Sequence, residues 1–116
     1  MRYVGVVPDE EWRALLRAHL DRADEFRVRM PDGEGPLSYG RAQFAALPEV
    51  TVGPWSGMRD AVEFAGPLTP AVRELFVELE PSLEELPKLW DYKLLQNGKV
   101  ILSIGDFHDV LIDVPS

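Results

Sequence analysis

The residues with the clearest chemical capacity lie together near the end of the chain. The stretch "SIGDFHDVLID" at 103–113 places Asp106, Asp109 and Asp113 around His108, one of two histidines in the chain. Carboxylate oxygens and imidazole nitrogens bind zinc and related metals, and a histidine beside a carboxylate also serves in acid–base catalysis. The spacing matches no metal motif, however, and aspartate favours turns because its side chain bonds nearby backbone amides. We therefore interpret "DFHD" as a turn and predict no metal and no cofactor.

The remaining residues do not indicate a nucleophilic site. Ser103, His108 and Asp109 have the residue types of a serine–histidine–acid arrangement, but Ser103 lacks the context of a nucleophile elbow. His19 falls on an apolar helical stripe, where a hydrogen-bonded core residue is expected. The absence of cysteine excludes thiolate metal sites, disulfides and cysteine nucleophiles. These patterns favour a protein that is not an enzyme, and we assign no catalytic residues.

The composition restricts the classes of partner. The net charge is −8, of which residues 59–116 contribute −6 through 5 basic and 11 acidic residues. An acidic surface repels phosphate backbones and anionic lipid, so we expect no nucleic-acid or membrane binding, whereas a basic protein partner is compatible. No apolar run reaches the roughly 18 residues of a spanning helix, so a cytoplasmic location is expected. The excess of arginine over lysine, 9 to 3, is typical of a GC-rich bacterial genome.

The spacing of apolar residues predicts the elements that position these groups. Helical spacing predicts two amphipathic helices, over 9–23 and 70–80, and Thr69 and Pro70 suit the N-cap and first position of the second. Short helices are also expected over 38–48, with Ser38 as N-cap, and after Pro81, with Leu83 and Leu86 facing inward. Alternating or β-branched runs predict strands over 3–7, 25–30, 50–52 and 61–64.

The strongest local signal is Asn97-Gly98 between two β-rich runs, which favours a two-residue type I′ turn. That turn pairs Leu95 with Val100, Leu94 with Ile101, Lys93 with Leu102, Tyr92 with Ser103, Asp91 with Ile104 and Trp90 with Gly105. One face, with Val100, Leu102 and Ile104, is the expected core. A third strand adds Val110 to it opposite Ile104, through a loop over 106–108 or 105–109, because other registers bury unpaired carboxylates.

The same register places Trp90, Tyr92, Leu94, Ile101 and Ser103 on the second face. One interpretation, which we favour, is that a helix covers most of this face. The other is a partly open platform in which Trp90 and Tyr92 supply contact area, bordered by Asp109 and Asp113, as in the aromatic centres of many protein interfaces.

The segment at 70–86 is acidic. Glu74 and Glu78 are four residues apart, as are Glu80 and Glu84, so each pair shares one side of a helix. A solvated face tolerates such repulsion, but a concentrated acidic face also steers a protein onto a basic partner.

Together these patterns predict one α+β domain over residues 1–116, with a mainly antiparallel sheet, a C-terminal three-stranded meander and two amphipathic helices packed on it. The function hypothesis is a non-enzymatic acidic protein-binding module, most concretely an immunity or antitoxin-type inhibitor of a basic protein. The predicted partner-binding residues are Glu74, Glu78, Glu84, Trp90, Tyr92, Asp106, His108, Asp109 and Asp113. The alternative is a small ligand-binding protein or metal-independent enzyme with a pocket near Trp90, Tyr92 and Asp109. No pattern indicates an oligomeric state.

Overall fold

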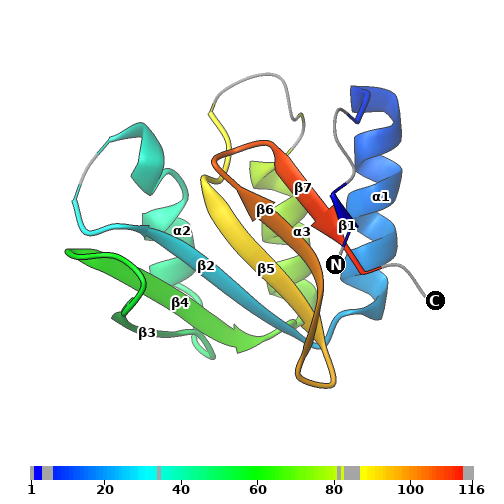
Figure 1. Cartoon of the computed structure of the whole chain (residues 1–116). Coiled ribbons are helices and arrows are strands. Elements are labelled where there is room, and N and C mark those ends of the chain that lie inside the picture. Colours follow the sequence, from blue (N-terminus) through cyan, green and yellow to red (C-terminus); the bar gives the residue numbers. More distant parts are fainter. Residues whose placement is uncertain (1, 4–6, 34, 81, 83–86, 114–116) are drawn as a thin grey trace.

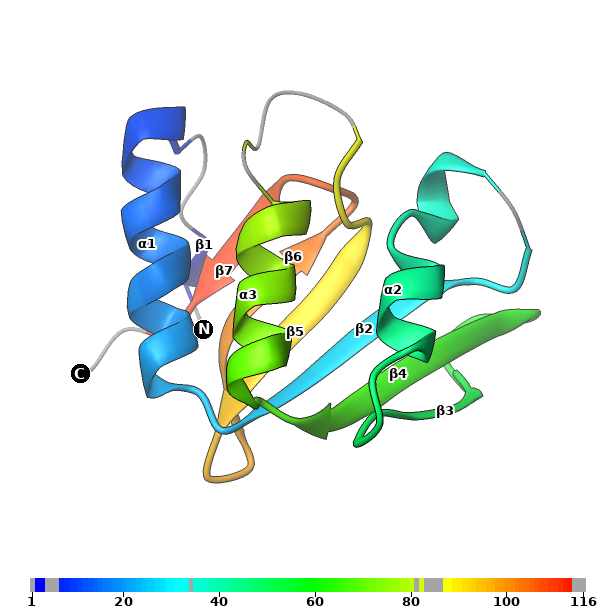
Figure 2. The ribbon, with the colours of Figure 1, turned by 180° about the vertical axis from the view of Figure 1, so that it is seen from behind.

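A seven-stranded antiparallel sheet with helices on one face forms the molecule (Figures 1 and 2). The computed structural model describes residues 2–3, 7–33, 35–80, 82 and 87–113. The strands are β1 (Arg2–Tyr3), β2 (Glu25–Pro31), β3 (Thr51–Pro54), β4 (Ala61–Pro67), β5 (Asp91–Gln96), β6 (Lys99–Gly105) and β7 (Asp109–Ile112). The helices are α1 (Asp9–Arg22), α2 (Arg41–Ala45) and α3 (Pro70–Leu79), with a 3-10 turn at Pro36–Ser38. The strand order is β1-β7-β6-β5-β2-β4-β3, and the predicted α+β class is confirmed.

The two predicted amphipathic helices are confirmed as α1 and α3. α1 follows Pro8 and has three acidic residues in its first turn, where the helix dipole favours negative charge. α3 begins as expected, because the Thr69 hydroxyl accepts a hydrogen bond from the Val72 amide at 3.3 Å. His19 is buried in α1, and its Nδ1 donates to the Leu15 carbonyl at 2.8 Å, so it is the hydrogen-bonded core residue that was predicted.

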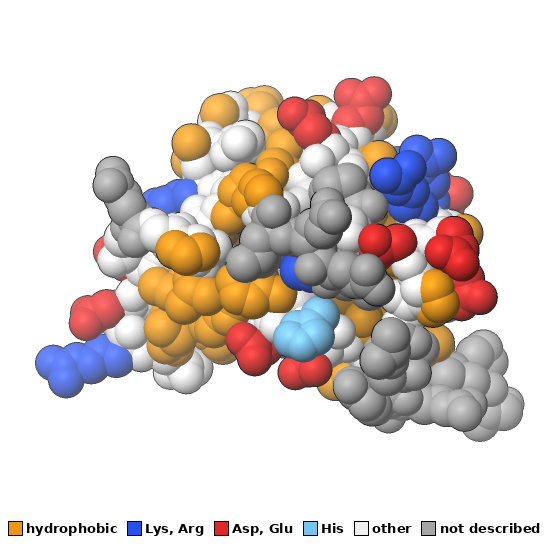
Figure 3. Space-filling view, turned by 90° about the horizontal axis from the view of Figure 1, so that it is seen from above, with side chains coloured by type: hydrophobic (Ala, Val, Ile, Leu, Met, Phe, Trp, Pro, Cys, Tyr) orange, Lys and Arg blue, Asp and Glu red, His pale blue; other side chains and the backbone are white. Residues whose placement is uncertain are grey.

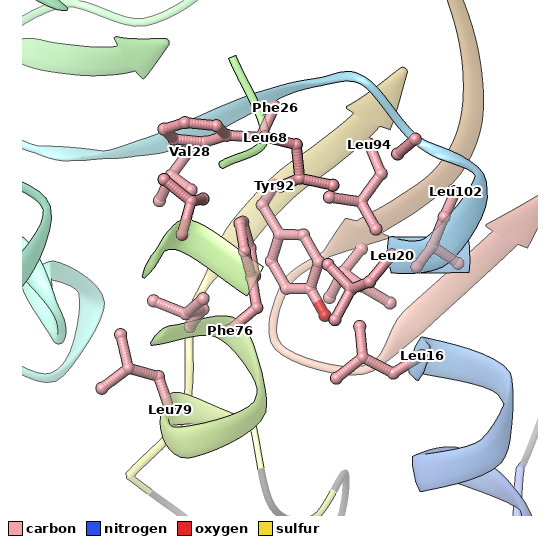
Figure 4. Packing of buried hydrophobic residues seen from close by; sticks show 14 of the residues in the cluster. Leu16, Leu20, Phe26, Val28, Leu68, Phe76, Leu79, Tyr92, Leu94 and Leu102 are labelled. Carbon is pink, nitrogen blue, oxygen red and sulfur yellow. The ribbon is translucent and has the colours of Figure 1, made fainter. Parts of the chain in front are cut away.

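The core lies between the sheet and these helices and is rich in aromatic rings. Phe26 of β2 lies 5.6 Å from Phe44 of α2 and 5.8 Å from Phe76 of α3, measured between ring centroids. Tyr92 of β5 completes the group at 5.0 Å from Phe76. Figure 4 shows the Tyr92 ring directed from its strand toward the helices, between Phe76 and the leucines of α1. Burial of these large rings is the main source of stability for a domain of this size.

The predicted turn of the β5–β6 hairpin is confirmed, but the register beyond it was wrong. Asn97 and Gly98 have φ values of 51° and 80°, as a type I′ turn requires, and Leu95 pairs with Val100. A bulge between Leu94 and Leu95 then shifts the pairing by one residue, so that Leu94 pairs with Leu102 rather than with Ile101. Lys93 pairs with Ser103 and Tyr92 with Ile104.

The bulge has a clear physical reason. Without it, Tyr92 and Leu94 would point away from the face that carries Leu102 and Ile104, because successive side chains alternate between the two faces of a sheet. The extra residue in β6 brings all four side chains to the helix-covered face, where all are buried. The favoured interpretation, that helices cover Tyr92, therefore holds, but Tyr92 does not share its face with Ser103.

The third strand of the meander follows the prediction. Ile104 pairs with Val110, and Gly105 pairs with Asp109, so the loop is the shorter of the two alternatives and spans residues 106–108. The strands expected over 25–30, 50–52 and 61–64 correspond to β2, β3 and β4, each with somewhat different bounds.

One prediction near the end of an element needs correction, and two lie partly or wholly outside the described residues. Ser38 does not cap a helix: its hydroxyl donates to the Pro31 carbonyl at 2.8 Å, and α2 begins only after Gly40. Of the strand expected over 3–7, Tyr3 lies in β1, Val7 lies outside any strand and residues 4–6 are not described. The short helix expected after Pro81, with Leu83 and Leu86, lies outside the described residues.

We expect Gly40→Ala to destabilise the protein more than Gly98→Ala does. Both glycines have positive φ, 88° and 80°, a conformation that costs other residues about 1–2 kcal/mol. A Cβ at Gly40 would also lie 2.9 Å from Leu89 Cδ2, which adds an overpacking cost of about 1–3 kcal/mol, whereas Gly98 has no such neighbour. Urea denaturation of both variants measures the difference, and equal losses would contradict this account of Gly40.

Candidate functional site

The structure divides the predicted partner-binding residues between two surfaces and the core. Glu74 and Glu78 are exposed on α3, on the helix-covered side of the sheet. The β6–β7 loop and its border carry three of the others, Asp106, His108 and Asp109, all exposed. Of the other four, Trp90 lies beside this loop, Tyr92 lies in the core, Asp113 pairs with Lys99, and Glu84 lies outside the described residues.

The loop at 106–108 is a tight turn between β6 and β7, as its composition indicates. Asp106 and Phe107 have φ values of 49° and 71°, and the Phe107 amide donates to the Trp90 carbonyl at 2.8 Å. His108 Nδ1 donates to the Asp106 carbonyl at 2.7 Å, which engages the ring nitrogen in holding the turn. Across the described ranges, no three histidine, aspartate or glutamate side chains converge as metal ligands.

Asp113 and Tyr92 are both separated from this loop. The Asp113 carboxylate pairs with Lys99 at 2.8 Å, and hydrogen bonding to Lys99 holds the pKa of Asp113 below its usual value. Tyr92 is completely buried among the core rings. Its pKa is raised well above the usual value, first by burial and then by the charge of Glu80. Tyr92 therefore forms no surface platform with Trp90.

The aromatic neighbour of Trp90 is Trp55, which sequence reasoning missed. The two indole rings lie edge to face with centroids 6.5 Å apart, and the Arg29 guanidinium lies 4.7 Å from the centre of the Trp55 ring. The available signal was a tryptophan within the glycine-rich turn "GPWSG". A Cβ at Gly57 would come within 2.8 Å of the Trp55 ring, so the glycine leaves room for it.

Seen from above, hydrophobic side chains gather on the sheet side of the molecule with acidic side chains at their border (Figure 3).

Paired charges lie beside the Trp55–Trp90 contact on the sheet face that carries no helix. Arg29 pairs with Glu63 at 2.6 Å, and both side chains are largely shielded, with 16% and 24% exposure. Asp91 and Lys93 follow on β5, where burial raises the pKa of Asp91 and lowers that of Lys93. Arg29 and Glu63 satisfy one another, whereas Asp91 Oδ1 has no hydrogen-bond partner within the described residues.

We expect the Arg29–Glu63 pair to contribute a coupling energy of about 1 kcal/mol to the free energy of unfolding. A double-mutant cycle with Arg29→Met and Glu63→Gln measures it. The matched control is a cycle on Lys99 and Asp113, where Lys99 is 70% exposed and the coupling should be smaller and disappear in salt. Equal coupling in the two cycles would contradict the shielding of the first pair.

The helix side carries a groove between α1 and α3. It has a volume of about 460 Å³ and is lined by Arg17, Leu20, Asp21, Arg73, Glu74, Val77 and Glu78. Arg73 is engaged within the protein, since its guanidinium donates to the backbone carbonyls of Leu20 at 3.1 Å and Ala23 at 3.4 Å. The two predicted residues Glu74 and Glu78 thus lie on one groove together with Asp21.

A smaller hollow of about 150 Å³ adjoins this groove. It shares Arg17 and Val77 with the larger one and adds Arg13, Leu16 and Glu80. The combined feature, which we call the α1–α3 groove, therefore has an outer part lined by three acidic and two basic side chains and an inner part lined by Arg13, Arg17 and Glu80.

Glu80 is the least expected residue of the groove, because it is a carboxyl group with only 1% exposure. Its Oε1 accepts a hydrogen bond from the Leu89 amide at 2.5 Å, but its Oε2 has no hydrogen-bond partner among the described residues. Burial raises the pKa of Glu80 to about 8, although the Leu89 amide and the charge of Lys88 oppose this shift. The nearby Tyr92 hydroxyl also favours the charged form, but makes no well-formed hydrogen bond.

The sequence contained a signal for the burial of Glu80. Val72, Phe76 and Glu80 are spaced at four-residue intervals, so Glu80 continues the apolar stripe of α3 by one more turn. The sequence analysis placed Glu80 with the acidic residues of the same segment, and so did not predict that its side chain is buried.

Comparisons with other proteins assign no family. No protein-family model, no curated protein and no solved structure matches the chain. No helix within the described residues is both long and apolar enough to cross a membrane.

We expect Glu80→Gln to stabilise the protein at pH 8 and above. In the wild type the folded state holds the Glu80 proton up to about pH 8, while the unfolded chain releases it near pH 4.5, so stability falls as pH rises between these values. Such a shift corresponds to roughly 3–5 kcal/mol when fully developed. A glutamine at this position keeps a side-chain oxygen that accepts the hydrogen bond from the Leu89 amide, but it has no carboxyl group to lose a proton.

Urea denaturation between pH 4.5 and 9 measures this dependence in both proteins. Glu78→Gln, on the exposed face of the same helix, is the control and should leave the wild-type pH profile unchanged. An identical profile for Glu80→Gln and the wild type would contradict the assignment.

Proposed function

We propose that this protein is a non-enzymatic acidic protein-binding module that binds a basic partner protein along the α1–α3 groove. The observation that carries the proposal is the position of Glu74, Glu78 and Asp21 around a groove that also has the apolar side chains Leu20 and Val77 in its lining. An apolar centre with a charged border is the usual composition of a protein interface.

The charge of the groove supports a basic rather than an acidic partner. Three acidic and two basic side chains line the outer part, and one of the basic ones, Arg73, already binds backbone carbonyls of α1. The net charge of −8 adds a long-range attraction that raises the rate of encounter with a cationic protein. An immunity or antitoxin-type inhibitor of a basic toxin is the most concrete form of this function.

The cytoplasmic location and the bacterial source, which are also part of the proposal, depend on amino-acid composition. The cysteine-free chain is suited to a reducing cytoplasm, and its excess of arginine over lysine suits a GC-rich bacterial source. The alternative function, a ligand or enzyme pocket near Trp90, Tyr92 and Asp109, has less support because Tyr92 lies in the core and Trp90 contacts Trp55 instead.

Charge reversal on α3 tests the proposal. We expect the double variant Glu74→Lys/Glu78→Lys to bind the basic partner at least about tenfold more weakly, because the groove border changes sign. The wild type and the variant are immobilised and exposed to a lysate of the source organism, and the captured basic protein is identified by mass spectrometry. Its affinity for each protein is then measured by calorimetry.

The control has the same change in net charge at a distance from the groove. Glu49→Lys/Asp60→Lys alters two exposed acids, one before β3 and one before β4, and should retain capture. Equal affinity of the partner for the α3 variant and for the wild type would overturn the proposal.

A further inference from the structure

We propose that the α1–α3 groove accepts an amphipathic α-helix of the basic partner protein. That helix carries basic residues on the flank that faces α3 and an acidic residue on the flank that faces the inner end of α1. The inference rests on the proposed function, since the partner supplies the helix. It adds the kind of element that is recognised and the pattern of charge that selects it.

The groove runs along two antiparallel helices. Arg73, near the start of α3, donates to the Leu20 carbonyl near the end of α1. Glu80, directly after α3, lines the inner hollow together with Arg13 and Leu16 from the first half of α1. Figure 2 shows the two helices side by side on the sheet. The groove therefore follows α1 from its last turn back to its second turn, a length of about 12 Å at a rise of about 1.5 Å per residue.

The walls of the groove favour a helix over an extended segment. Both walls are helices, whose backbone groups bond within each helix, so the groove presents side chains rather than a strand edge. An extended segment would leave its own amides and carbonyls unpaired there, which is unfavourable for buried polar groups. A helix satisfies its own backbone, and two of its turns span about 11 Å. Apolar side chains at positions i, i+3 or i+4, and i+7 of that helix then reach the lining formed by Leu20 and Val77.

The two walls carry opposite charges. Glu74 and Glu78 line the groove from α3, one helical turn apart, and both are exposed. Arg17 lines the outer and the inner part from α1 and is also exposed. Among the described residues, no ion pair joins Arg17 to either glutamate. The charges of the two walls therefore do not neutralise each other across the groove, and a partner can pair with both.

A helix that matches both walls must carry both signs of charge. Lysines or arginines on its α3 flank complement Glu74 and Glu78, and a carboxylate on its other flank complements Arg17. Asp21, at the outer end of the α1 wall, favours a further basic residue there. Arg73 adds less to this pattern, because its guanidinium donates to backbone carbonyls of α1. A helix with the same charge on both flanks places like charges against one of the walls.

NMR titration with two synthetic peptides tests the groove directly. The probe is a lactam-stapled helix of about 15 residues, with leucines at i, i+3, i+4 and i+7, lysines on one flank and glutamates on the other. The control peptide has the same composition, but its leucines are distributed around the helix. We expect the probe, at up to about 1 mM, to shift the amide signals of the residues that line the groove, and the control to leave them unchanged. No shifts with the probe, or equal shifts with both peptides, would overturn the inference.

The variant Arg17→Glu tests the charge pattern. We expect it to bind the probe at least about tenfold more weakly than the wild type does, because the α1 wall changes sign. A second probe, in which lysines replace the glutamates, should show the reverse order and bind the variant more tightly. Arg59→Glu, at an exposed arginine between β3 and β4, makes the same change in net charge and should keep both wild-type affinities within about twofold. Equal affinities of the two variants for both probes would contradict the charge pattern.

Binding of the captured partner separates this inference from the proposed function. Hydrogen exchange identifies the segment of the partner that becomes protected, which we expect to be an amphipathic helix, and circular dichroism confirms that each variant is folded. If Glu74→Lys/Glu78→Lys does not bind the partner, but the protected segment is not such a helix or Arg17→Glu binds with wild-type affinity, the inference is wrong and the proposed function stands. If the probe binds in the groove but charge reversal on α3 has no effect on the partner, the partner uses another surface and the proposed function is wrong.

Discussion

One extra residue in β6, opposite the step between Leu94 and Leu95, determines which side chains form the core. The bulge aligns Tyr92 and Leu94 with Leu102 and Ile104 on the face that α1 and α3 cover. Without that shift the two strands would present their large apolar side chains to opposite faces, and neither set could be buried completely. The packing of Phe76 on Tyr92, and with it the position of α3, depends on this local irregularity.

The placement of α3 in turn creates the groove. α3 contacts α1 through Arg73, whose guanidinium reaches two carbonyls near the end of α1, and the space between the helices remains open along Leu20 and Val77. The sheet face without helices has a different character, because Arg29, Glu63 and the tryptophan pair satisfy one another across it. The larger part of the groove between the helices is lined by three acidic and two basic side chains, an excess of one negative charge.

Glu80 and Asp91 are carboxyl groups that depart, within the described residues, from the rule that buried polar atoms are hydrogen-bonded. Glu80, on an apolar stripe with one oxygen unpaired and its pKa raised to about 8, weakens the fold at neutral and alkaline pH. Proteins retain such conflicts between sequence and packing mainly at positions that serve a ligand or partner.

Short-range sequence patterns were sufficient to predict much of the architecture. The helical stripes of α1 and α3, the Thr69 cap, the Asn97-Gly98 turn and the short loop before β7 depend on neighbouring residues, because helix periodicity, capping and turn geometry are set within a few positions. The acidic character of α3 and the exposure of Glu74 and Glu78 followed from the same spacing.

Tertiary structure decided the rest. The bulge was not visible in the alternation of β6, since every residue from Ile101 to Ile104 is buried and a strand buried on both faces has no alternating pattern. The contact between Trp55 and Trp90 joins two loops far apart in the sequence, and the free oxygen of Glu80 depends on how α1, α3 and β5 meet. The sequence by itself determined which elements form and where acid accumulates, whereas long-range packing alone decided that an oxygen of Glu80 and one of Asp91 are buried without a hydrogen-bond partner.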